Sequence, residues 1–310
     1  MGKKDTCAWE FYSDPARYAD VVNGLICGGE QVVGKGDLHE LDSRIGQKSR
    51  DLLREVVFGN NIAVIGIENQ EHVDYSMPQR MLLYEAKVYE KLTASIQADV
   101  KKDSSGISAS EYLGRFRKDD KFHPHATLVL YYGQEPWDGE KHLHKIIDFT
   151  DIPESLQKLV QDYQVHVVDV RCLEDTSVFK TDVKLVFDFI RYSDDSEKLE
   201  RLVKGNPAYQ ELDKKAFEFI SYYGDAHSLR ECREYKEKGQ VVNMCKALDE
   251  IYAKGEVRGE ARGIEKEKAD TVRNALQMEM PMEQIMNLCR CSAEYVERIR
   301  SAIDNRIKLL

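Results

Sequence analysis

Apolar side chains near the N-terminus recur at the spacing of a helix. They are Tyr18, Val21, Val22, Leu25 and Ile26, which a helix places on one face. Pro15 follows Asp14, an order that is typical of a helix start capped by an aspartate. The pattern predicts a helix within residues 14–33, with Gly28 and Gly29 as its ending signal.

Two further apolar segments have the length and composition of strands. They cover residues 51–58 and 62–70, with Gly59, Asn60 and Asn61 between them. Glycine and asparagine adopt the positive backbone angles that tight hairpin turns need. The two segments therefore predict an antiparallel hairpin.

The middle of the chain continues with one helix and two strands. Met77 and Pro78 begin a helix that is expected to run to about Leu92, and strands follow at 126–132 and 165–170. From about Lys180 onward the apolar spacing is helical. Helices are expected over 183–199 with a break near Ser193, over 216–223 and over 241–253.

Glycine recurs every fourth residue near the C-terminal part of the chain. Gly255, Gly259 and Gly263 stand among charged residues, and each glycine weakens a helix by about 1 kcal/mol relative to alanine. The segment is therefore a weak helix or a linker. On a helix the glycines would form a stripe, and we favour a solvated linker over a stripe that packs against another element.

The last segment, residues 270–303, predicts two or three short helices. Pro281 begins one helix and Ser292 caps the next, a spacing that resembles a helix-turn-helix. The alternative is simple helical packing or a dimerisation tail. We favour this alternative because the second helix offers only Arg298 and Arg300 to contact bases.

Charge and composition narrow the classes of partner. The 310 residues are 42% hydrophobic and 32% charged, with a formal net charge of −10, which argues against a protein that coats nucleic acid through overall basicity. No apolar run is long enough for a membrane span, and the N-terminus does not resemble a signal peptide. Seven cysteines without paired spacing indicate a reducing compartment, so we expect a cytoplasmic protein.

Acidic and polar side chains gather where the second hairpin strand ends. The two-residue period of a strand places Glu68 and Gln70 on one face and Asn69 on the other. A glutamate at the end of an apolar strand needs a partner, and Asp51 at the start of the neighbouring strand is a like charge. Two such carboxylates are stable together around Mg²⁺, with the backbone carbonyl of Asn69 as a further ligand. A metal held there would favour phosphodiester hydrolysis.

Arg80, Tyr84 and Lys87 follow on the predicted helix at spacings that give them one shared face. This face predicts contact with DNA phosphates, with Lys87 as a cation for the metal site. The alternative is a surface arginine and lysine beside a core tyrosine, and we favour it for Lys87. His123, His125, His142 and His144 lack partners at ligand spacing, so we expect them to bind no metal.

The order of a helix, a strand beginning with aspartate, a turn, a strand ending in Glu-x-polar, and a helix resembles the PD-(D/E)XK nuclease core. Several strings are similar to the Rpn family of recombination-promoting nucleases, also called PD-(D/E)XK nuclease family transposases: Tyr18-Ala-Asp-Val-Val-Asn23, Ile67-Glu-Asn-Gln70, Asp74-Tyr-Ser-Met-Pro78 with Arg80 and Tyr84, and Leu128-Val-Leu-Tyr-Tyr-Gly133 with Trp137. The resemblance covers roughly residues 10 to 250. It implies an α/β (α+β-like) fold, in which a restriction-endonuclease-like core has a mixed central sheet flanked by helices and is followed by a helical C-terminal region.

The resemblance also implies a function. It implies a DNA endonuclease that depends on Mg²⁺, with Mn²⁺ as a substitute, and that acts in recombination or transposition. Asp51 and Glu68 would be metal ligands, and Gln70 would stand in the position of the motif's lysine, where it positions water without carrying charge. Asp20 resembles an acidic residue that some members add to the metal shell; a solvated helix residue is the alternative. The alternative function is a catalytically weak or inactive nuclease-fold module for DNA binding or interaction.

These patterns divide the chain into four parts. A nuclease core over 10–175 precedes a helical extension packed on it (176–254), a glycine- and charge-rich helix or linker (255–269) and a small helical tail (270–310). DNA is the expected partner and a membrane is not. A homodimer is a further candidate.

Overall fold

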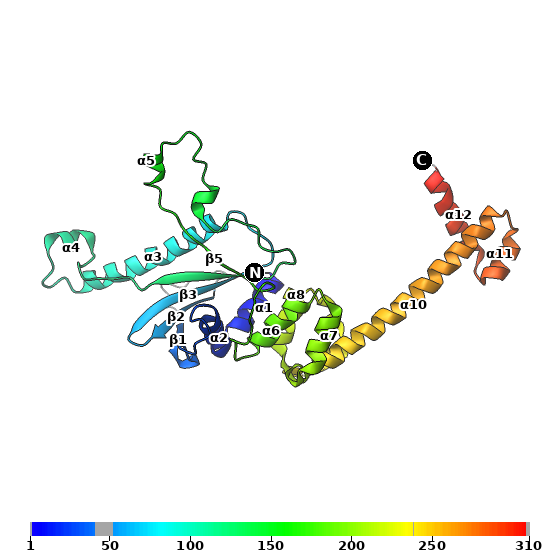
Figure 1. Ribbon diagram of the computed structural model, residues 1–310, viewed down its shortest axis with the longest axis horizontal. Helices are drawn as coiled ribbons and strands as arrows, with labels where there is room; N and C mark the ends of the chain where they lie inside the picture. The colour runs from blue at the N-terminus through cyan, green and yellow to red at the C-terminus, as the bar shows by residue number, and fades with distance from the viewer. Residues whose placement is uncertain (1, 41–51, 238, 308–310) are drawn as a thin grey trace. The chain divides into compact units, whose positions relative to one another are not determined.

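A computed structural model describes residues 2–40, 52–237 and 239–307 (Figure 1). The chain divides into two compact units, Met1–Ala247 and Leu248–Leu310. Asp51, one of the two predicted metal-binding carboxylates, lies outside the described residues. Over the described residues, no helix is both long and apolar enough to cross a membrane.

The first unit combines helices with a central sheet. Its strands are β1 (Leu38–Glu40), β2 (Leu52–Phe58), β3 (Asn61–Gln70), β4 (His125–Tyr131) and β5 (His166–Asp169), with a small pair β6 (Leu212–Asp213) and β7 (Val241–Val242). Its helices are α1 (Lys3–Tyr12), α2 (Pro15–Leu25), α3 (Met77–Lys102), α4 (Ala109–Gly114), α5 (Glu154–Gln157), α6 (Val183–Tyr192), α7 (Ser196–Gly205), α8 (Lys214–Tyr223) and α9 (Arg233–Glu237).

The five strands β1 to β5 stand in sequence order, so β3 is central. The β1–β2 and β2–β3 pairs are antiparallel, whereas β3–β4 and β4–β5 are parallel. The predicted hairpin is confirmed: Phe58 pairs with Asn61, and Gly59 has a φ of +60°, which glycine adopts without strain. The expectation of a mixed sheet flanked by helices is thus confirmed.

Helix α3 packs on one face of the sheet (Figure 1). Val88 and Leu92 contact Val64 of β3, and the first turns of the helix pack on Val129 of β4. The helix runs to Lys102, ten residues beyond the predicted end near Leu92. The apolar spacing does continue, since Leu92 is followed by Ile96 and a buried Val100, so the helix keeps one apolar side to its last turn.

Helix α2 begins as predicted but ends early. The Asp14 carboxylate accepts hydrogen bonds from the backbone amides of Ala16 and Arg17. The helix ends at Leu25, so the prediction that it could extend to residue 33 is wrong. The side chain of Asn23 accepts hydrogen bonds from the backbone amides of residues 32 and 33, which folds the following chain back against the helix.

The hydroxyl of Tyr18 on α2 joins this helix to the hairpin. It donates to the carbonyl of Ile65 at 2.6 Å and lies 3.2 Å from the carbonyl of Leu52. In Figure 1, α1 and α2 lie on the side of the sheet away from α3. The central strand is therefore covered on both faces, which explains why residues 63–68 are all buried.

The helical extension packs on α1 and α2. The predicted break near Ser193 is confirmed, because α6 ends at Tyr192 and α7 begins at Ser196. Buried aromatic rings join the extension to the N-terminus: Phe11 lies 4.8 Å from Phe219, and Tyr132 of the sheet lies 5.4 Å from Phe219, between ring centroids.

The second unit is a small helical bundle. Helix α10 (Met244–Gln277) enters it, followed by α11 (Met282–Cys289) and α12 (Ala293–Ile307). Val272, Ala275, Ile285 and Val296 form its buried core. The glycine-rich segment is part of α10 and is therefore helical. It is also solvated, because a Cβ at Gly255, Gly259 or Gly263 would meet no atom within 4 Å, so the glycines form no packing stripe among the described residues. Charged residues that are good helix formers separate the glycines, which offsets part of the glycine penalty.

His125 begins strand β4 and is a half-buried histidine without a polar partner among the described residues. Among the described residues, neither ring nitrogen has a hydrogen-bond partner, and the ring packs edge-on to Tyr89. Burial lowers the pKa of His125 to about 4. The histidine is therefore neutral in the folded protein near neutral pH.

His125 is expected to make the first unit less stable in mild acid. An unfolded histidine titrates near pH 6.5, so as the pH falls the unfolded chain binds this proton before the folded chain does. The contribution of the neutral His125 to the free energy of unfolding is therefore fully present above that pH. It is lost as the pH falls from about 6.5 towards about 4. Between pH 7 and pH 5 the loss is about 2 kcal/mol. Urea denaturation at both pH values measures it, and His125→Leu should lose this component; an unchanged pH dependence in the variant would contradict the assignment.

Candidate functional site

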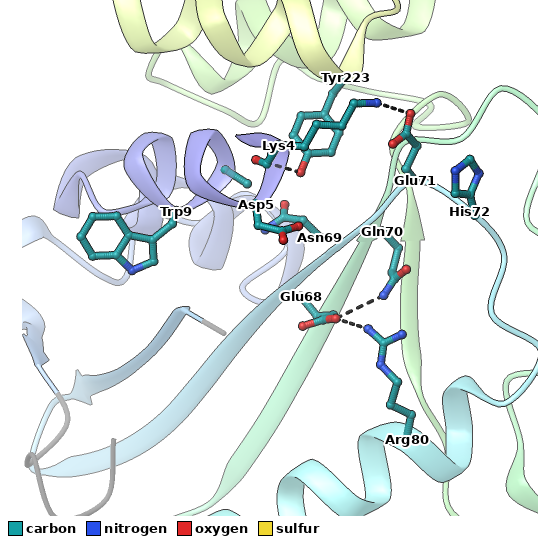
Figure 2. Close-up of a pocket in the computed structure, with 11 residues that line it drawn as sticks. Lys4, Asp5, Trp9, Glu68, Asn69, Gln70, Glu71, His72, Arg80 and Tyr223 are labelled. Carbon is teal, nitrogen blue, oxygen red and sulfur yellow. Dashed lines mark hydrogen bonds and ion pairs between the residues drawn. The ribbon is translucent and has the colours of Figure 1, made fainter. Parts of the chain in front are cut away.

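The carboxyl end of the central strand brings three of the predicted site residues together. Glu68 and Gln70 extend towards α3, and Asn69 extends towards α1 (Figure 2). This is the alternation that a strand imposes. Glu68 is only 7% exposed, so its carboxylate needs compensation from neighbouring donors.

The Glu68 carboxylate has two described donors, and both reach the same oxygen. Nη2 of Arg80 forms an ion pair with Oε1, and Nε2 of Gln70 donates to Oε1 at 3.2 Å. Arg80 lies one turn into α3, twelve residues after Glu68. The first turn of α3 therefore supplies the counter-charge for the buried carboxylate.

A second carboxylate fixes the Arg80 guanidinium. Nη1 of Arg80 donates to Asp74 at 2.8 Å, and Asp74 accepts hydrogen bonds from the backbone amide and the hydroxyl of Ser76. Partial burial opposes the charge on Asp74, but the Ser76 hydrogen bonds and the Arg80 ion pair outweigh it and lower the pKa of Asp74. Burial likewise opposes the charge on Arg80, but Glu68 and Asp74 raise the pKa of Arg80. Both groups stay charged at neutral pH.

Asn69 belongs to a buried chain of hydroxyl groups. The Tyr132 hydroxyl lies 3.1 Å from Oδ1 of Asn69 and 2.7 Å from the Tyr12 hydroxyl. Burial raises the pKa of both tyrosines, so the hydroxyls are neutral donors. This chain holds the strand end against α1, which leaves the Asn69 backbone, and not its side-chain oxygen, as a candidate ligand.

The strand end borders a cavity of about 290 Å³. Its lining comes from α1, the end of β3, α3 and α8: Lys4, Asp5, Ala8, Trp9, Glu68, Asn69, Gln70, Glu71, His72, Arg80 and Tyr223. An ion pair between Lys4 and Glu71 ties α1 to the segment that follows β3 (Figure 2). Helix α1 is not among the predicted elements, although Cys7, Ala8, Phe11 and Tyr12 show helical apolar spacing.

The structure places Asp20 in a different environment from the one predicted. Its carboxylate accepts hydrogen bonds from the backbone amides of Lys180 and Thr181 and from the Thr181 hydroxyl. It fixes the turn before α6 and does not line the cavity. The solvated alternative is wrong, because Asp20 is only 3% exposed. Its hydrogen bonds to the turn before α6, away from the cavity lining, give no support to the predicted place in the metal shell.

Arg80, Tyr84 and Lys87 share a side of α3, but only Arg80 reaches the cavity. Tyr84 packs against the buried cluster of Met77, Met81, Val129 and Val165. Lys87 is exposed, with its ammonium 5.7 Å from the centre of the Tyr84 ring. The alternative of a core tyrosine beside a surface lysine therefore describes these two residues, and the predicted role of Lys87 at the metal site has no structural support.

The end of β3 offers few oxygen donors for a cation among the described residues. Within the described ranges, which omit Asp51, no group of three His, Cys, Asp or Glu side chains could hold a metal ion. The Glu68 carboxylate and the Asn69 backbone carbonyl are oxygen donors of the kind that Mg²⁺ prefers. Asp51 directly precedes Leu52, which pairs with Ile67, the neighbour of Glu68.

Two of the histidines that the sequence singled out, His142 and His144, have hydrogen-bond partners. His142 contacts the Asp162 carboxylate at 2.7 Å, and Nε2 of His144 lies 2.8 Å from the Val160 carbonyl. These contacts close the base of the segment between β4 and β5.

A scan of protein-family models and searches of curated proteins and of solved structures find no match to this chain.

Proposed function

We propose that this protein is a metal-dependent DNA endonuclease with a PD-(D/E)XK core. The observation that carries the proposal is the buried Glu68 carboxylate, which ends the central strand at the wall of a polar cavity beside Gln70 and Arg80. The order of α2, β2, β3 and α3 supports it. It is the order of a helix, two strands joined by a turn, and a second helix, on which the sequence resemblance rests.

Glu68, Asp51 and the Asn69 carbonyl are the proposed ligands of Mg²⁺. The bound ion would polarise a phosphate oxygen and lower the pKa of a bound water. Gln70 would orient that water: its Nε2 donates to Glu68, which leaves its amide oxygen to accept a proton of the water. The net charge of −10 makes DNA contact a local property of the cavity, where Lys4 and Arg80 are cations.

Cleavage of supercoiled plasmid tests the proposal. The wild-type protein is expected to nick plasmid with Mg²⁺ or Mn²⁺ but not with EDTA. Glu68→Gln and Asp51→Asn keep the side-chain shape but remove a charged ligand, so each should lower the rate at least about a hundredfold. Glu55→Gln is the matched control, since Glu55 lies in the same hairpin without lining the cavity. Equal nicking by all four proteins would place the activity elsewhere.

One observation favours a second candidate, a nuclease-fold module that binds DNA without cutting it. Glu68 already has a cationic partner in Arg80, and Gln70 is uncharged. If Asp51 and Glu68 do not form a metal site, titration calorimetry will detect no Mg²⁺ or Mn²⁺ binding while DNA affinity persists. That combination would replace the nuclease proposal with the binding module.

A further inference from the structure

Phosphodiester hydrolysis needs positive charge near the phosphate, and the cavity offers few cations. A phosphate gains negative charge on its oxygens as the reaction proceeds, so fixed cations beside it accelerate the reaction. Gln70 supplies none. Of the described lining residues, only Lys4 and Arg80 carry a full positive charge. Lys4 is paired with Glu71, whereas Arg80 contacts the carboxylate that ends the central strand.

On one edge of the Arg80 guanidinium, only one of the two nitrogen donors has a partner among the described residues. Its Nε and Nη2 point along the same edge, which suits two oxygens of one phosphate or carboxylate. Nη2 contacts Oε1 of Glu68, but among the described residues the buried Nε has no hydrogen-bond partner. A buried donor without an acceptor is costly, and the described part of the chain offers no acceptor to the Nε on this edge.

The other side of the guanidinium is held independently of Glu68. Nη1 donates to Asp74 at 2.8 Å, and Asp74 is itself fixed by Ser76. The Tyr84 ring lies 5.8 Å from the guanidinium carbon and adds a favourable contact. These contacts would hold Arg80 at the cavity without its ion pair to Glu68.

We propose that the Nε–Nη2 edge of Arg80 binds the phosphate that is cleaved, and that its ion pair with Glu68 holds this edge until the carboxylate binds a metal. The inference rests on the proposed nuclease function. It gives Arg80 two roles. Arg80 supplies the positive charge that Gln70 lacks, and it competes with the metal for the Glu68 carboxylate. Lys87 is not an alternative source of that charge, because it does not line the cavity.

The two roles of Arg80 predict opposite effects of one substitution. Arg80→Ala removes the cation that competes for Glu68, so calorimetry should show Mn²⁺ binding about threefold to tenfold tighter than in the wild type. Plasmid cleavage should nevertheless fall at least about a hundredfold, since the phosphate loses a charged bidentate donor. Arg80→Lys keeps the charge without the planar edge, and should fall at least about tenfold in cleavage with little change in Mn²⁺ affinity.

The outcomes separate this inference from the function on which it rests. Lys101→Ala, an exposed cation at the far end of α3, should match the wild type in both measurements. If the wild type binds Mn²⁺ and cuts DNA, cleavage by Arg80→Ala at the wild-type rate overturns the inference alone. Loss of both Mn²⁺ binding and cleavage in Arg80→Ala also overturns it, because Arg80 would then only position Glu68. If Arg80→Ala does not fold, wild-type cleavage by Arg80→Lys overturns it. A wild type that neither binds Mn²⁺ nor cuts removes the proposed function as well.

Discussion

Replacing Arg17 with methionine is expected to lower the free energy of unfolding by about 3 kcal/mol. The Arg17 side chain is 9% exposed and forms ion pairs with Asp182 at 2.7 Å and Asp213 at 2.6 Å. Its guanidinium also lies over the Phe11 ring, 4.4 Å from the centroid. The substitution leaves two carboxylates near one another without their shared cation. Asp182 and Asp213 each lie at the start of a helix, where the helix dipole stabilises negative charge. The loss in free energy of unfolding should therefore not be much greater than about 3 kcal/mol.

Urea denaturation of Arg17→Met and of a surface-pair variant gives the comparison. Lys158 and Glu154 form an ion pair at 2.7 Å with side chains 72% and 78% exposed. Lys158→Ala should change stability by less than about 0.5 kcal/mol, since such pairs are solvated. If Arg17→Met costs no more than Lys158→Ala, the ion pairs do not hold the helical extension to α2.

Gly24→Ala is expected to destabilise the first unit by about 1–3 kcal/mol, against the usual stabilising effect of alanine in a helix. A Cβ at Gly24, near the end of α2, would lie 2.4 Å from Cε1 and 2.8 Å from Cδ1 of Phe179. Phe179 is 2% exposed and packs edge-on to Phe187 at 5.1 Å, so its ring has little room to move.

Gly205→Ala is the matched control for this packing argument. Gly205 is the last residue of α7, and a Cβ there would meet no atom within 4 Å. Its substitution should leave stability within about 0.5 kcal/mol of the wild type. Thermal unfolding of both variants measures the contrast, and a Gly24→Ala protein as stable as Gly205→Ala would show that Phe179 relaxes freely.

The sequence predicts best where the determinants are local. The hairpin follows from two apolar segments with Gly59 and two asparagines between them, and the start of α2 follows from Asp14 and Pro15. The end of α2 depends instead on Asn23, whose side chain reaches backbone amides nine and ten residues ahead. Gly28 and Gly29 do lie in the turn after the helix, both with positive φ. No periodic pattern encodes the Asn23 contact, so the range predicted for the helix ran on too far, to residue 33.

The residues of the candidate site likewise divide into those that the local sequence predicts and those whose role depends on contacts between distant parts of the chain. Glu68, Asn69 and Gln70 were predictable because one strand presents them together. Arg80 was predicted as part of a helix face, but its ion pair with Glu68 depends on how α3 packs against β3. The role of Asp20 depends on residues 160 positions away, and the contribution of α1 to the cavity depends on its packing against α8 and the sheet. Contacts of this range arise only from the assembled fold.

Residues 252–267 of α10 are exposed on every side, and a Cβ added at Gly255, Gly259 or Gly263 would meet no atom within 4 Å. Cooperative unfolding needs buried contacts that make the loss of one part costly to another, and this stretch of helix supplies none. Each unit has a core of its own. We therefore expect each to have its own unfolding equilibrium, so that no single melting temperature describes the chain. A substitution such as Arg17→Met reports on the first unit alone.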